Sequence, residues 1–114
     1  MSNRRMFNKQ IIYRFDFVRM SESAQRLYQY LIFEADDDGF VGDARMVTRM
    51  ANAPESAYEE LKSNGFVYEF KSGVCVIIHW LHHNSVFRDG YQHTNFHEEW
   101  SQINLIGNNY VPII

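Results

Sequence analysis

Three helical patterns followed by two β-rich segments, all between residues 21 and 84, constrain the fold more than any other feature. After Ser21 and Ser23, either of which can cap a helix, apolar residues recur at the i, i+3, i+4, i+7 and i+8 spacing of one buried helix face. They are Ala24, Leu27, Tyr28, Leu31 and Ile32. This spacing predicts a helix over 22–35. Two shorter helices are expected over 43–52, with Asp43 as N-cap, and over 54–64, ended by a glycine cap.

Two β-branched and aromatic segments follow, over 66–70 and 74–80, and Lys71-Ser72-Gly73 between them predicts a hairpin turn. Residues 40–42 (FVG) are expected to add a very short third strand. Helix, short strand, helix, turn, helix, β-hairpin is the order of a winged helix-turn-helix. The sequence therefore predicts an α+β, mainly helical domain of this class.

The 114 residues suffice for one domain, which we divide into three parts. Residues 1–20 are a basic N-terminal arm and residues 21–84 the winged helix-turn-helix core. Residues 85–114 are a C-terminal extension, packed on the core or on a partner, in which the YQHTNFHEEW stretch predicts one helical turn. The apolar tail NLIGNNYVPII also makes a homodimer possible.

Three consecutive aspartates, Asp36, Asp37 and Asp38, precede Gly39 and raise the question of a metal site. If Gly39 occupied the sixth position of a calcium loop, Arg45 would stand where the bidentate glutamate is required. A turn explains the stretch better, because aspartate ends helices and glycine accepts a positive φ. The five histidines also lack the thiolate pair of many zinc sites. We expect no metal, no cofactor, no catalytic residues and no enzymatic activity.

Charge is unevenly distributed along the chain. Residues 1–20 carry a net charge of +4, whereas the rest carries −7, for a total of −3. The cations that could contact duplex DNA are Arg4, Arg5, Lys9, Arg45, Arg49, Lys62, Lys71 and Arg88. The third predicted helix is acidic, so the expected footprint is the arm together with the second helix.

Several stretches resemble the N-terminal winged-helix domain of phage replisome organisers, replication-initiation proteins of phages and prophages of Gram-positive bacteria. They are MSNRRMFNKQII, ADDDGFV, SGVCVIIHW, WLHHN and RDGYQHTNFHEE, which span nearly the whole chain. The resemblance implies binding to replication-origin DNA, with Phe40, Val41, Trp80, His83 and Asn84 as positions that define the fold. The sequence ends at Ile114, so the family's recruitment of the helicase-loading machinery is not carried over. Gly90, Gln92 and His93 stand where the family pattern is basic.

A second hypothesis follows from the acidic body. A phage-encoded inhibitor of a host replication or defence protein, as anti-CRISPR proteins are, could imitate phosphates with an acidic surface. Its candidate residues are Asp36, Asp37, Asp38, Glu55, Glu59 and Glu60.

Two further features bear on location. Cys75 is the only cysteine, which excludes an internal disulfide. No stretch approaches the roughly 20 apolar residues of a membrane span, and the N-terminus lacks the apolar core of a signal peptide. We expect a protein of the host bacterial cytoplasm, with no membrane partner.

Overall fold

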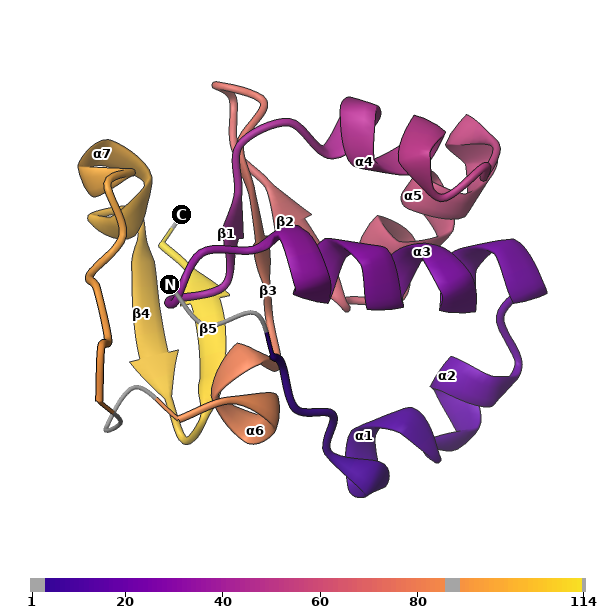
Figure 1. Ribbon diagram of the computed structural model, residues 1–114, viewed down its shortest axis with the longest axis horizontal. Helices are drawn as coiled ribbons and strands as arrows, with labels where there is room; N and C mark the ends of the chain where they lie inside the picture. Colours follow the sequence, from indigo (N-terminus) through magenta and orange to yellow (C-terminus); the bar gives the residue numbers. More distant parts are fainter. Residues whose placement is uncertain (1–3, 86–88, 114) are drawn as a thin grey trace.

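Three helices form one layer of the protein in the computed structural model, which describes residues 4–85 and 89–113 (Figure 1). They are α3 (Glu22–Glu34), α4 (Ala44–Met50) and α5 (Glu55–Ser63). Side-chain caps fix two of their N-termini, because Ser21 accepts a hydrogen bond from the amide of Ala24 and Asp43 accepts one from Met46. The three predicted helices are confirmed, each within two residues at either end.

The predicted strands form a three-stranded antiparallel sheet in the order β1-β3-β2. Its strands are β1 (Phe40–Val41), β2 (Val67–Glu69) and β3 (Cys75–Ile77). Phe40 pairs with Val76, and Val67 pairs with Ile77. The predicted strand over 74–80 was too long at its C-terminal end, because Trp80 begins the short helix α6 (Trp80–His83) instead of continuing the strand.

The segment before α3 is folded, not extended. It forms two short helices, α1 (Lys9–Ile12) and α2 (Phe15–Val18), whose Ile11 and Phe17 are buried in the core. Phe17 packs edge-on against Tyr28 and Phe66, with ring centroids 5.3 and 5.5 Å away. These contacts join the segment to α3 and to the start of the sheet.

The C-terminal segment contains the predicted helical turn, α7 (His97–Trp100), and a hairpin that the sequence analysis did not predict. The hairpin strands are β4 (Ile103–Ile106) and β5 (Asn109–Pro112). Tyr110 fastens β5 to the rest of the protein, because its amide donates to the carbonyl of Ile78 and its side chain is buried. Leu105 and Ile106 on β4 remain exposed, and a homodimer through this hairpin stays a prediction.

No helix in the described ranges is long and apolar enough to cross a membrane.

Gly39 allows the chain to turn directly beneath Trp80. Its φ is +90°, and a Cβ added there would lie 2.5 Å from Cγ of Trp80. Gly73 is a matched control, since its φ is +93° and an added Cβ meets nothing within 4 Å. We expect Gly73→Ala to lower the free energy of unfolding by about 1–2 kcal/mol through backbone strain. Gly39→Ala should cost about 1–3 kcal/mol more because of the clash. Urea unfolding of both variants measures the difference, and equal losses would contradict the close packing of Trp80.

Candidate nucleic-acid interface

The three aspartates form a turn, as predicted. Oδ1 of Asp36 accepts hydrogen bonds from the amides of Asp38 and Phe40, both at 3.0 Å, so the side chain closes the loop between α3 and β1. Burial raises the pKa of the Asp36 carboxyl. Among the described residues, no group of histidine, cysteine or acidic side chains is arranged to hold a metal ion.

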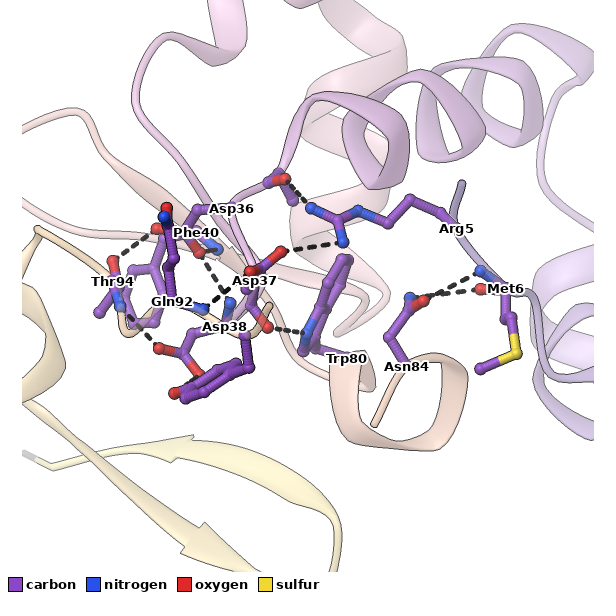
Figure 2. Close-up of polar contacts among 12 residues, drawn as sticks. Arg5, Met6, Asp36, Asp37, Asp38, Phe40, Trp80, Asn84, Gln92 and Thr94 are labelled. Atoms are coloured by element: carbon purple, nitrogen blue, oxygen red, sulfur yellow. Dashed lines mark hydrogen bonds and ion pairs between the residues drawn. The ribbon is translucent and has the colours of Figure 1, made fainter. Parts of the chain in front are cut away.

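The same carboxylates also hold the C-terminal segment, a role that the sequence did not reveal (Figure 2). Asp38 accepts hydrogen bonds from the amide of Thr94 and from the hydroxyl of Tyr91, both at 2.7 Å. Asp37 accepts one from the amide of Gln92 at 2.9 Å, and Asp36 accepts one from the hydroxyl of Thr94. The aspartate turn, residues 36–38, is therefore the anchor for residues 91–94.

Arg5 is not available to DNA, which contradicts its expected place on the surface. Its side chain is 2% exposed and its guanidinium lies 3.1 Å from Oδ1 of Asp37. It also donates to the carbonyl of Ala35, at the end of α3, and lies 5.2 Å from the ring centroid of Trp80 (Figure 2). A buried carboxylate needs such a partner, so the arginine is structural.

The acidic surface of the inhibitor hypothesis is also mostly absent. Asp37 and Asp38 are 2% and 1% exposed, so they cannot imitate phosphates on a surface. Glu60 is bound to the amide and hydroxyl of Ser21, at 2.9 and 2.8 Å. Of the proposed acids, Glu55 and Glu59 are the ones that α5 exposes to solvent.

Two arginines of α4 face a hollow between α4, α5 and β2. Arg45 and Arg49 line it, together with Glu55, Glu59 and Lys62, and its volume is about 280 Å³. Neither guanidinium has a hydrogen bond or ion pair with another described residue. Their positive charge is therefore not neutralised by a fixed partner.

Lys62 differs from these arginines because it is already paired. Its ammonium lies 2.8 Å from Glu59 and 3.1 Å from Glu69, and these carboxylates raise its pKa. It is a weaker candidate for a phosphate contact than the sequence suggested.

The remaining predicted cations lie in different places. Lys71 is exposed at the tip of the β2–β3 hairpin and lines a second hollow that Arg45 also lines. Arg4 and Lys9 are exposed on the N-terminal segment. Helix α1 of this segment lies away from α4 (Figure 1). Arg88 lies outside the described residues.

Sequence reasoning missed the role of Arg26. Its guanidinium donates to the carbonyls of Ala51 and Asn52, at 2.8 and 3.0 Å, and so holds the turn between α4 and α5. Asn52 has a φ of 54°, a left-handed conformation that asparagine tolerates. The exposed position of Arg26 on α3 carried no signal of this contact.

Two histidines hold the N-terminal segment on the body. Nδ1 of His83 accepts a hydrogen bond from the backbone amide of Asn8 at 2.7 Å, and Nε2 of His83 lies 2.8 Å from the hydroxyl of Tyr28. Nε2 of His79 lies 3.2 Å from the guanidinium of Arg14. Burial lowers the pKa of both imidazoles to about 4.

Comparison with known proteins gives no match: no family model, no curated protein and no solved structure corresponds to this chain.

Removal of Arg5 should destabilise the protein strongly. Arg5→Ala removes the buried guanidinium that lies 3.1 Å from the carboxylate of Asp37 and donates to the carbonyl of Ala35, and the expected loss is about 3–5 kcal/mol in the free energy of unfolding. Lys9→Ala, which removes an exposed cation of the same segment, should change it by less than about 0.5 kcal/mol. Urea unfolding measures both values. Similar small losses in the two variants would show that Arg5 is not needed for stability.

Stability should also fall in mild acid. The unfolded chain binds protons at its histidines below about pH 6.5, whereas folded His79 and His83 stay neutral to about pH 4. The free energy of unfolding therefore decreases as the pH falls from about 6.5 to 4, by at most about 1.4 kcal/mol per pH unit for each group. Asp36 opposes this trend at the acidic end of the range. Its pKa is raised in the folded protein, so its protonation favours the folded state as the pH falls.

Urea unfolding at several pH values tests this dependence. His83→Gln should flatten the slope, whereas His97→Gln, at an exposed position, should leave it unchanged. Equal slopes in the wild type and in His83→Gln would refute the assignment.

Proposed function

We propose that this protein is a non-catalytic winged helix-turn-helix protein that binds duplex DNA and is related to phage replisome organisers, acting in the cytoplasm of the host bacterium. The order α3, β1, α4, α5, β2, β3 and the sheet order β1-β3-β2 support this class. In such proteins the second helix of the pair enters the major groove, while flanking elements bind phosphates.

The observation that carries the proposal is a pair of arginines on α4 whose guanidinium groups have no partner within residues 4–85 and 89–113. Arg45 and Arg49 are one helical turn apart, so their side chains project from one face of the helix. Arg45 lines both the hollow beside α5 and the hollow beside the hairpin tip, where Lys71 lies. Three cations therefore follow one surface from α4 to the tip of the hairpin, where they can contact the phosphates of one duplex.

The inhibitor hypothesis has less support. Two of its six acids are buried, Glu60 is held by Ser21, and Glu59 is paired with Lys62. No feature of the described residues favours an acidic protein-binding surface over the cationic one on α4.

Binding of a random-sequence duplex should be salt-dependent and should require α4. We expect affinity to fall steeply between about 50 and 200 mM salt, because each phosphate contact releases counterions. The double variant Arg45→Ala/Arg49→Ala should bind more weakly and lower the slope of log affinity against log salt by about two. Fluorescence anisotropy measures both quantities.

Arg19→Ala provides the matched control. Arg19 is an exposed arginine directly after α2, and α2 lies on the opposite side of α3 from α4 (Figure 1). Its removal should leave the slope unchanged. If the wild type binds no duplex at low salt, or if Arg19→Ala weakens binding as much as the double variant, the proposed surface is wrong.

A further inference from the structure

Helix α5 offers hydrogen-bond acceptors to a ligand and no unpaired cation. Glu55 and Glu59 are exposed and lie one helical turn apart, and Ser56 is exposed beside them. The cation of this helix, Lys62, is bound to Glu59 and to Glu69 on β2. A helix with this surface repels phosphates, so any favourable contact with DNA has to be made to the edges of bases.

The two glutamates share a hollow with the arginines of α4. Arg45 and Arg49 form one wall of the space of about 280 Å³, and Glu55 and Glu59 form another. Lys62 holds Oε2 of Glu59 at 2.8 Å, which restrains that side chain and leaves its other oxygen available. The carboxylate of Glu55 has no hydrogen bond or ion pair with another described residue, so both of its oxygens are available. Phosphate-binding and acceptor groups are thus side by side.

A carboxylate can only accept hydrogen bonds, and this limits which base it can recognise in the major groove. Guanine presents two acceptors there, and thymine presents an acceptor and a methyl group. Adenine presents an amino group, but its acceptor N7 lies next to it and repels a carboxylate. Cytosine presents the N4 amino group as a donor and is the base that glutamate and aspartate recognise.

We propose that Glu55 and Glu59 determine specificity by accepting hydrogen bonds from cytosine amino groups, while Arg45 and Arg49 bind the adjacent phosphates. This inference rests on the proposed function. It explains why the helix expected to enter the groove is acidic in a DNA-binding protein. The two carboxylates weaken binding to unrelated sequences, because their repulsion of the DNA phosphates is offset only where a cytosine amino group can donate a hydrogen bond to them.

The test begins with selection of duplexes from a random library by the wild-type protein. Its affinity for the enriched site is then compared with its affinity for the same site carrying thymine in place of the enriched cytosine, which replaces a donor by an acceptor. We expect this exchange to weaken wild-type binding by about tenfold or more. Glu55→Gln should reduce the discrimination to less than about threefold and should strengthen binding to unselected duplex.

Glu59→Gln is the second variant, and Glu22→Gln is the control. Glu22 is exposed in the first turn of α3, so its substitution changes the net charge equally but lies outside the hollow. It should leave the ratio of the two affinities unchanged. If the wild type binds duplex but the selection enriches no cytosine, the inference is wrong and the proposed function stands. The same holds if both α5 variants keep the wild-type ratio of affinities for the cytosine and thymine sites. If the wild type binds no duplex at low salt, both the inference and the proposed function fail.

Discussion

The ion pair between Arg5 and Asp37 is the contact on which the rest of the structure depends. It is almost fully buried, and it joins the N-terminal segment, the end of α3 and the aspartate turn at one point beside Trp80. Burial of either charge alone would be costly, and the pairing of the two groups offsets that cost. Around this pair, the amide of Gln92 and the indole of Trp80 donate to Asp37, which brings the C-terminal segment and α6 to the same place. One turn of three acids thereby unites the two ends of the chain with the helical layer.

This arrangement changes what the charge of the protein means for its function. A net charge of −3 argues against DNA binding when charges are counted along the sequence. Two acids of the aspartate turn are nevertheless buried, where they serve the fold, and Arg5 leaves the surface with them. On α5 and β2, Lys62 holds one carboxylate oxygen of Glu59 and one of Glu69. Arg45 and Arg49 of α4 remain as two cations with no side-chain partner in the part of the chain that the structure describes. The local charge, not the net charge, therefore decides which surface can bind a polyanion.

The sequence predicted the elements whose causes are local. Helices α3, α4 and α5 and the β2–β3 hairpin were found from apolar spacing, caps and glycines, and the aspartate turn from the propensities of its residues. The β4–β5 hairpin was missed although Gly107-Asn108 between two apolar segments is a recognised turn signal. The burial of Arg5 and the role of Arg26 were not predictable, because both depend on contacts with residues 25 or more positions away. The pairing of Lys62 is different, because its partners Glu59 and Glu69 lie three and seven positions away, and the i,i+3 spacing of Glu59 and Lys62 on one helix face was a local signal that was missed.

The most direct test of DNA binding through α4 is a nuclear magnetic resonance titration of the ¹⁵N-labelled protein with a duplex at low salt. We expect amide shifts to change along α4, in the first turn of α5 and at the tip of the β2–β3 hairpin. The amides of α1, α2 and the β4–β5 hairpin should stay in place. Changes confined to α1 and α2, or no changes at all, would contradict this expectation.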